Sequence, residues 1–509
     1  MTTLARDAST LTRDALAVLQ PGFTGTEAPA WLLRRLGEGL AAVGLFGRNI
    51  ASPEQLAALT AELRAARPDV LVAIDEEGGD VTRLESRTGS SFPGNLALGR
   101  IDDPALTRRV ARELGARLAG CGVNLNWAPS ADVNSNPDNP GIGVRSFGAD
   151  PELVARHTVA YVEGLQDAGV AACVKHFPGH GDTAEDSHLA LPRVDADLGT
   201  LHARELVPFR AAIAAGSKCV MSAHILLPAL DAERPATLSA AALTGLLRAP
   251  RDRGGLGHQG LIVTDALEMK AIADTHGIER GAVLAIAAGA DALCVGGHLA
   301  DEDTVLGLRD ALVRAVHEGE LPEHRLAEAA SRVRALADWA AAQRRAESAA
   351  AHEDSGTGLR AARRALRVTG AREPLSAPPF VAAFTPYANI AVGDETPWGV
   401  AAELEHLLPG TATASYGAAE AGDPQALAAR LLADAGERRV VAVVRDEHRH
   451  PWMAGALRAL VAARPETVVV EMGVPQAPPS GALHIATHGA ARVCGRAAAE
   501  VIGGAQEDD

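Results

Sequence analysis

Short apolar runs alternate with helix-like stretches along the first two thirds of the chain, and this alternation limits the fold more than any other feature. The runs are rich in β-branched residues and end in polar or glycine-rich turns, and the stretches between them are rich in alanine and arginine. Strands that alternate with helices predict βα units around a parallel sheet. The seven runs cover residues 43–50, 70–76, 123–128, 170–176, 219–225, 260–266 and 290–295.

This pattern favours an α/β fold of the TIM type, a (β/α)8 barrel in which seven strands are visible and the eighth is not. A doubly wound sheet is the alternative, but no GxGxxG follows the first run, so a dinucleotide-binding fold has little support. Barrel enzymes place their chemistry at the carboxyl ends of their strands, and polar residues gather there in this chain. The polar residues at these strand ends are Asp75, Glu76, Asn126, Lys175, His176, His224 and Asp265, and His224 is among those expected to contact the substrate.

A chain of 509 residues exceeds the size of one ordinary hydrophobic core, which predicts two domains. The barrel is expected to cover residues 1–345, and a polar, glycine-containing stretch at 346–358 is typical of a linker. A second, smaller α/β unit follows at 359–509, with strands expected at 380–384, 440–445 and 467–471. The polar group Asp446, Glu447, His448 and His450 after the second of these strands is interpreted as a solvated loop.

The net charge of −16 argues against a nucleic-acid partner, because binding phosphates requires a basic surface. Five cysteines without a CxxC pair indicate buried free thiols and a reducing compartment. The amino terminus has no basic segment followed by an apolar one, and no apolar stretch is as long as a membrane span. These features predict a cytoplasmic protein without a membrane partner.

The segment 175–188 holds three histidines and two aspartates among glycines and a proline. Three interpretations stay open: a metal site, a structural polar loop, or an acid/base dyad. In the dyad, Asp186 and His188 project to the same side of an extended loop, because they are two positions apart. Asp186 then accepts a hydrogen bond from one ring nitrogen of His188 and fixes its tautomer, and the other nitrogen faces a substrate.

Three further candidates come from other strand ends. Asp265 ends an apolar run and is a nucleophile, a ligand or the N-cap of a following helix. Asp75 is followed by paired glycines and Arg83, and its carboxylate could bind sugar hydroxyls. Arg145 lies in a polar loop rich in turn residues, which is either a surface loop or a carrier of ligand contacts.

Four motifs together resemble family 3 glycoside hydrolases, in particular the β-N-acetylhexosaminidase branch. They are IDEEGG with the following arginine, NPDNPGIGVRSF, KHFPGHGDTAEDSHLALP and GLIVTDALEM, in that order. The resemblance covers roughly residues 10–340, and the last unit is similar, more weakly, to the family's accessory α/β sandwich domain. Two positions depart from the family pattern. Asp80 stands where many relatives have arginine, and Ala266 stands where many have a second aspartate.

The resemblance implies a role for each matching residue. Asp265 is the expected nucleophile, His188 the general acid/base and Asp186 its orienting partner. The residues expected to bind the N-acetylglucosamine unit are Asp75, Arg83, Arg145, Lys175 and His176. No metal and no cofactor are expected, because the branch uses none.

The function that the resemblance implies is retaining exo-hydrolysis of terminal β-linked N-acetylglucosamine from saccharides derived from cell wall or chitin. A covalent glycosyl-aspartate is the expected intermediate. Three alternatives stay open: a phosphorylase that uses phosphate in place of water, a non-catalytic sugar-binding protein, and a metal-dependent hydrolase.

Overall fold

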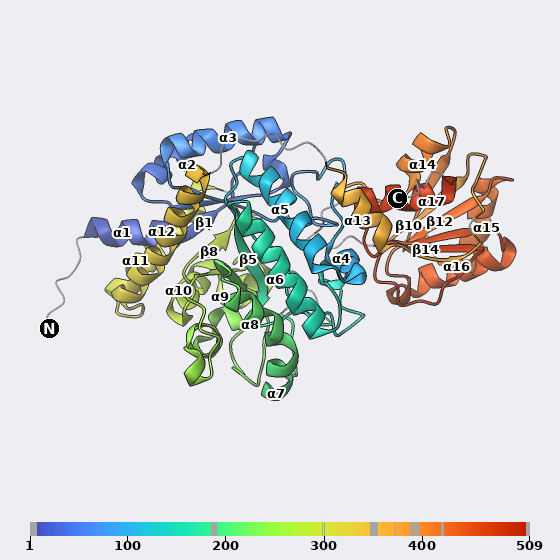
Figure 1. Cartoon of the computed structure of the whole chain (residues 1–509). Coiled ribbons are helices and arrows are strands. Elements are labelled where there is room, and N and C mark those ends of the chain that lie inside the picture. Colours follow the sequence, from blue (N-terminus) through green and yellow to red (C-terminus); the bar gives the residue numbers. More distant parts are fainter. Residues whose placement is uncertain are drawn as a thin grey trace. The chain divides into compact units, whose positions relative to one another are not determined.

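The computed structural model describes residues 8–184, 191–297, 299, 301–346, 355–371, 373–386, 392, 396–418 and 422–504. The chain divides into two compact units (Figure 1). The first comprises Met1–Glu76, Thr107–Gly141 and Ala149–Glu353, and the second comprises Glu77–Leu106, Ile142–Gly148 and Asp354–Asp509. Two segments from the amino-terminal half therefore belong to the same unit as the last third of the chain.

The first unit is built on parallel strands. Six of them form one sheet in the order β2-β3-β4-β5-β6-β7, and β1 pairs with β8 in parallel. A bridge between Val263 and Ala292 connects β7 to the residue that precedes β8. The strands are β1 (Leu19–Pro21), β2 (Ala42–Leu45), β3 (Leu71–Ile74), β4 (Leu125–Asn126), β5 (Ala171–Phe177), β6 (Cys219–Ser222), β7 (Leu261–Thr264) and β8 (Leu293–Val295). The strand that the sequence did not reveal is β1, which has three residues and ends in proline.

Helices between consecutive strands provide the crossovers that parallel strands need. Local sequence explains where two of them begin: Ser52 and Asp150 each accept a hydrogen bond from a backbone N–H of the first turn, and a proline follows each. The main helices are α1 (Ala8–Ala17), α2 (Ala30–Glu38), α3 (Pro53–Ala66), α5 (Pro104–Gly120), α6 (Pro151–Asp167), α8 (Leu206–Ala214), α9 (Lys270–His276), α10 (Ile278–Ala288), α11 (Glu302–His317) and α12 (Glu323–Ala346).

The second unit holds a six-stranded sheet in the order β11-β10-β12-β13-β14-β9, in which only the edge strand β9 runs antiparallel. The strands are β9 (Arg367–Gly370), β10 (Phe380–Thr385), β11 (Ala412–Gly417), β12 (Val440–Val444), β13 (Val468–Glu471) and β14 (Leu483–Ala486). The helices are α4 (Asn95–Ile101), α13 (Thr357–Ala365), α14 (Ala401–Leu407), α15 (Pro424–Ala435), α16 (Pro451–Ala463) and α17 (Arg492–Gly503). The three strands predicted for this unit correspond to β10, β12 and β13.

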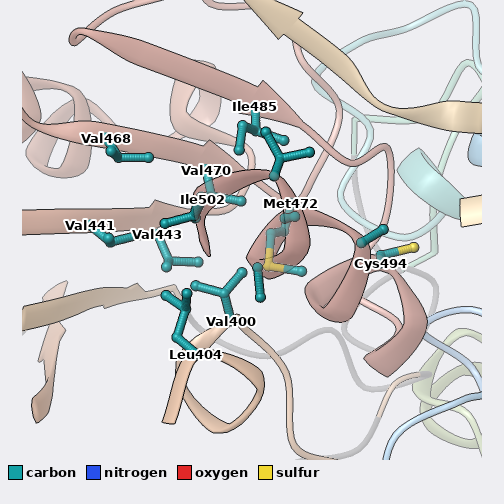
Figure 2. Close-up of a cluster of buried hydrophobic side chains, with 14 of the residues drawn as sticks. Val400, Leu404, Val441, Val443, Val468, Val470, Met472, Ile485, Cys494 and Ile502 are labelled. Carbon is teal, nitrogen blue, oxygen red and sulfur yellow. The ribbon is translucent and has the colours of Figure 1, made fainter. Parts of the chain in front are cut away.

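Both faces of this sheet carry a hydrophobic core, because alternate residues of a strand point to opposite faces. Val441 and Val443 of β12 pack with residues of α14 and α17, a cluster that Figure 2 shows around Met472. Val440 and Ala442, which alternate with them along the strand, pack on the opposite face with residues of α15 and α16. Strands buried on both faces are nearly continuously apolar, as β12 is.

Both ends of the linker expected at 346–358 are helical, because α12 extends to Ala346 and α13 begins at Thr357. All five cysteines are buried free thiols, as predicted. Among the helices described, none is long and apolar enough to cross a membrane.

Candidate active site

Asp75 and Lys175 form an ion pair in the first unit. Asp75 directly follows β3, and Lys175 lies within β5, two strands away in the sheet. The Lys175 ammonium donates to Oδ1 of Asp75, and the lysine side chain is only 2% exposed. A charge buried to this degree requires a partner of opposite sign, because isolated burial of an ammonium is very unfavourable. The pair therefore holds the Asp75 side chain in place at the carboxyl end of β3.

His176 is held by Asp132, a residue that the sequence did not single out. Nδ1 of His176 lies 2.7 Å from Oδ2 of Asp132, and Oδ1 of Asp132 accepts the backbone N–H groups of His176 (3.2 Å) and His180 (2.7 Å). Burial raises the pKa of Asp132, but the charge and hydrogen bond of His176 outweigh burial and hold that pKa well below its usual range. Asp132 is therefore a carboxylate that orients the His176 ring.

A sequence signal for Asp132 existed but was weak. Asp132 is a lone acid in the stretch Ala128-Pro-Ser-Ala-Asp132-Val133, six positions after the end of β4. Acids directly at strand ends are the stronger signal of a site in a parallel sheet, and Asp132 lies beyond such an end. The backbone explains its position, because the N–H of Ala131 donates to the carbonyl of Lys175 at 2.6 Å and so places this stretch alongside β5.

The middle of the 175–188 segment is held by internal hydrogen bonds. Nδ1 of His180 lies 2.9 Å from Oγ1 of Thr183, and the amide of Asn139 donates to the His180 carbonyl at 2.8 Å. Burial, followed by the nearby His176, lowers the pKa of His180 to about 4, so this ring is neutral near pH 7. Arg204 pairs with Asp182 at 2.5 Å. These bonds indicate a structural role for residues 178–183.

The two residues of the predicted acid/base dyad, Asp186 and His188, lie outside the described residues. The described part of the segment ends at Ala184. The assignment of these two residues therefore stays a prediction.

Asp265 directly follows β7 and is partly exposed. Its Oδ1 accepts the N–H of Ala266 at 2.8 Å. The next helix, α9, begins at Lys270 and has Met269 as its N-cap. The helix-cap interpretation of Asp265 is therefore wrong, because four residues of turn separate the carboxylate from the helix. What is left of the sequence alternatives is a nucleophile or a ligand.

His224 holds the turn that carries Asp265. Its Nε2 donates to the carbonyl of Ala266 at 3.0 Å, and its Nδ1 lies 2.8 Å from Oγ1 of Thr237. The side chain is fully buried. This geometry gives His224 a positioning role, and the substrate contact expected from the sequence stays a prediction. Glu268 supports the same turn, because its Oε1 accepts the N–H of Gly296 at 2.8 Å.

Two predicted sugar-binding residues, Arg83 and Arg145, belong to the second unit. Arg145 forms a bidentate pair with Glu77, with Nε–Oε2 and Nη2–Oε1 distances of 3.0 and 2.7 Å. Both side chains are buried, and the amide of Asn95 donates to the Arg145 carbonyl at 2.7 Å. Arg83 lies with Nη1 3.5 Å from the carbonyl of Val392. Arg145 is thus fixed by a carboxylate that the sequence did not identify as its partner.

No group of three or more His, Cys, Asp or Glu within the described part of the chain is arranged to hold a metal ion. The groups present at the strand ends are carboxylates, an ammonium and imidazoles. Carboxylates at the carboxyl edge of a parallel α/β sheet, beside fixed cationic groups, are typical of an enzyme active site.

Comparison with known proteins identifies the family. Residues 26–336 match the N-terminal domain of glycosyl hydrolase family 3, and the chain belongs to that family. The solved structure of a family 3 β-N-acetylglucosaminidase from Paenibacillus sp. str. FPU-7 is 34% identical and has a TM-score of 0.84. It covers 99% of this chain, which in turn covers 97% of it.

Two sequence relatives each match about half of the chain. A β-hexosaminidase from Alkalilimnicola ehrlichii is 40% identical over 281 residues, which are 52% of this chain and 79% of that protein. β-Hexosaminidase A from Pseudoalteromonas piscicida is 41% identical over 251 residues, or 45% of this chain. The match spans 41% of the length of the Pseudoalteromonas protein.

Proposed function

We propose that this chain is an exo-β-N-acetylglucosaminidase that hydrolyses terminal β-linked N-acetylglucosamine from saccharides derived from cell wall or chitin. The observation that carries the proposal is the position of Asp265. It is a partly exposed carboxylate directly after β7, at the same edge of the sheet as the Asp75–Lys175 pair. The likeness to the Paenibacillus β-N-acetylglucosaminidase over almost the whole chain supports the choice of sugar.

In the proposed reaction, the Asp265 carboxylate attacks the anomeric carbon while His188 gives a proton to the leaving-group oxygen. The glycosidic bond breaks and a glycosyl-aspartate forms. Neutral His188 then takes a proton from water, whose oxygen attacks the anomeric carbon and releases the aspartate. Two displacements retain the β configuration. Asp186 orients His188 in both steps.

The remaining site residues bind the sugar in this proposal. Asp75, which pairs with Lys175, accepts hydrogen bonds from sugar hydroxyls. His176 contacts the sugar with a ring that Asp132 orients through Nδ1. Arg83 and Arg145 are the further donors to the sugar in this proposal.

We also propose that the eight strands of the first unit close into a (β/α)8-type barrel. The β1–β8 pairing and the Val263–Ala292 bridge support closure on one side. Residues 359–509 are proposed to form the accessory α/β sandwich, and the helices on both faces of the second sheet support this.

The first test replaces the nucleophile. Asp265→Asn is expected to lower kcat on a β-N-acetylglucosaminide by about 10⁴-fold or more, because covalent catalysis is removed. Asp274→Asn, an exposed aspartate on α9, is the matched control and should keep wild-type kcat. If Asp265→Asn retains substantial activity, the assigned nucleophile is wrong.

Product analysis tests the stereochemistry and the acceptor. NMR at early times should show the β-anomer of N-acetylglucosamine first, and the α-anomer first would rule out retention. Reactions with and without phosphate should give the same rate and no sugar-1-phosphate. Dependence on phosphate would establish a phosphorylase. The kcat/KM values for N-acetylglucosaminyl-muramic acid, chitobiose and a plain β-glucoside then define the aglycone and the need for the acetamido group.

A further inference from the structure

Asp80 is a buried aspartate in the second unit, directly after the paired glycines that follow β3. Its Oδ2 pairs with the guanidinium of Arg445, and its Oδ1 accepts the backbone N–H of Ala490 at 2.7 Å. The side chains of Asp80 and Arg445 are 2% and 15% exposed. Both carboxylate oxygens are therefore bound by residues from the last third of the chain.

Arg445 directly follows β12, and the turn after it is held by hydrogen bonds. Glu471, at the end of β13, accepts the N–H groups of Asp446, Glu447 and Gly473 at 3.0, 3.2 and 2.6 Å. Asp446 in turn accepts the N–H of Val474 at 2.7 Å. The polar group that the sequence predicted to be a solvated loop is thus held by the buried carboxyl group of Glu471, and this fixes the base of the Arg445 side chain.

The position of Arg445 in the sheet is informative. In the order β11-β10-β12-β13-β14, β11 is added on one side of β10, and β12, β13 and β14 are added on the other side. The strand order therefore reverses between β10 and β12. Open α/β sheets bind their ligands outside the carboxyl ends of the strands at such a reversal. Here a guanidinium directly after β12 binds a side chain from residues 77–106 of the same chain.

Further bonds tie this segment to the same edge. The N–H of Val493 donates to the carbonyl of Ser90 at 3.3 Å, and Nε of Arg492 donates to the carbonyl of Gly89, also at 3.3 Å. Gly79, with φ of +67°, allows the backbone at residue 79 to approach the backbone at Gly94, because a Cβ at residue 79 would lie 2.4 Å from Cα of Gly94. The backbone on both sides of Arg83 is therefore fixed at Asp80 and at 89–90.

We infer that Asp80 is a positioning residue for sugar binding: with Arg445 it fixes the segment that carries Arg83. The inference rests on the proposed function, which assigns Arg83 to the sugar. It also accounts for the aspartate at a position where many relatives have arginine. An arginine at 80 would oppose the guanidinium of Arg445, so this chain requires an acid there.

The test is a double-mutant cycle between Asp80 and Arg83. Asp80→Asn removes the charge and keeps an oxygen for the N–H of Ala490. We expect it to raise KM for a β-N-acetylglucosaminide by roughly tenfold and to change kcat less than threefold, because a small displacement of a binding group weakens positioning. Arg445→Gln removes the partner of Asp80 and should raise KM by a similar factor. Arg445→Lys keeps a positive charge and should raise KM less. In an Arg83→Gln background, Asp80→Asn should have no further effect on KM.

Asp103→Asn is the matched control, because Asp103 lies in the same segment and pairs with Arg364 at 3.0 Å in a more exposed position. Its KM should stay within about twofold of wild type. Thermal unfolding and circular dichroism of each variant establish that it is folded, and if Asp80→Asn does not fold, Arg445→Gln carries the cycle. An unchanged KM for the folded variant, or the same factor in both backgrounds, overturns the inference while the proposed function stands. An unchanged KM for Arg83→Gln removes Arg83 from the proposed sugar site and overturns the inference with it.

Discussion

Lysine occurs at only three positions in the chain, and one of them, Lys175, is buried against Asp75. Arginine supplies nearly all other positive charge, so the lysine marks a site where a compact ammonium fits and a planar guanidinium does not. Asp132 and His224 each position another part of the site. Asp132 orients the ring of His176, and His224 holds the turn after Asp265. The strand ends thus combine groups predicted from sequence with supports found only in three dimensions.

Replacement of Lys175 tests this. Lys175→Gln is expected to lower kcat/KM by about 10²–10³-fold, because it leaves Asp75 without its buried counter-charge, a loss of about 3–5 kcal/mol. Lys175→Arg should not restore activity, since the larger, planar group does not fit the same buried space. Lys218→Gln is the matched control. Lys218 is half-buried over the ring of Trp339 at 5.4 Å and should tolerate the change. Wild-type kcat/KM in Lys175→Arg would contradict the argument.

At the scale of elements, the sequence predicted seven strands of the first unit because β2 to β8 lie in nearly continuous apolar runs. It missed β1, since three residues ending in proline carry no periodicity. It also missed β9 and β11, whose residues are largely exposed or half-exposed and so do not form apolar runs. The N-cap alternative for Asp265 required a helix from residue 266, but residues 266–269 form a turn although their composition favours a helix.

The turn around His180 predicts a pH dependence. A folded-state pKa of about 4, against 6.5 for an ordinary histidine, means that the unfolded chain binds the proton first as the pH falls. The contribution of His180 to stability is therefore complete above pH 6.5 and is lost between 6.5 and 4, by on the order of 3 kcal/mol.

His180→Asn keeps a polar atom near Thr183 and does not titrate. The difference in unfolding temperature between wild type and this variant, measured from pH 8 to pH 4, should change in favour of the variant below pH 6.5. A difference that stays constant over this range would show that His180 is protonated equally in both states.

At the scale of the whole molecule, the sequence predicted two domains and assigned all of residues 1–345 to the first, whereas two segments of that range belong to the second unit. Loop composition carries no information about distant partners, and Asp80 and Arg445 are 365 positions apart. Residues 77–106 and 142–148 follow β3 and β4, yet they belong to the same compact unit as residues 354–509.

This organisation makes the two parts of the chain difficult to separate. A protease site inserted at 347–354 should give two fragments that elute together from a sizing column under native conditions, because the amino-terminal fragment contains two segments of the second unit. The uncleaved protein is the reference for elution and activity. Fragments that separate without denaturant would show that the second unit does not depend on these segments.

The paired residues Asp80 and Arg445 also have a consequence for synthesis on the ribosome. Domains generally fold as they emerge, amino-terminal part first, at about 5–20 residues per second. With 365 residues between its two halves, the ion pair forms roughly 20–70 s after Asp80 has been made. Throughout this delay, the nascent chain carries a polar segment whose binding partner has not yet been translated. The second unit can therefore assemble only after almost the entire chain has been made.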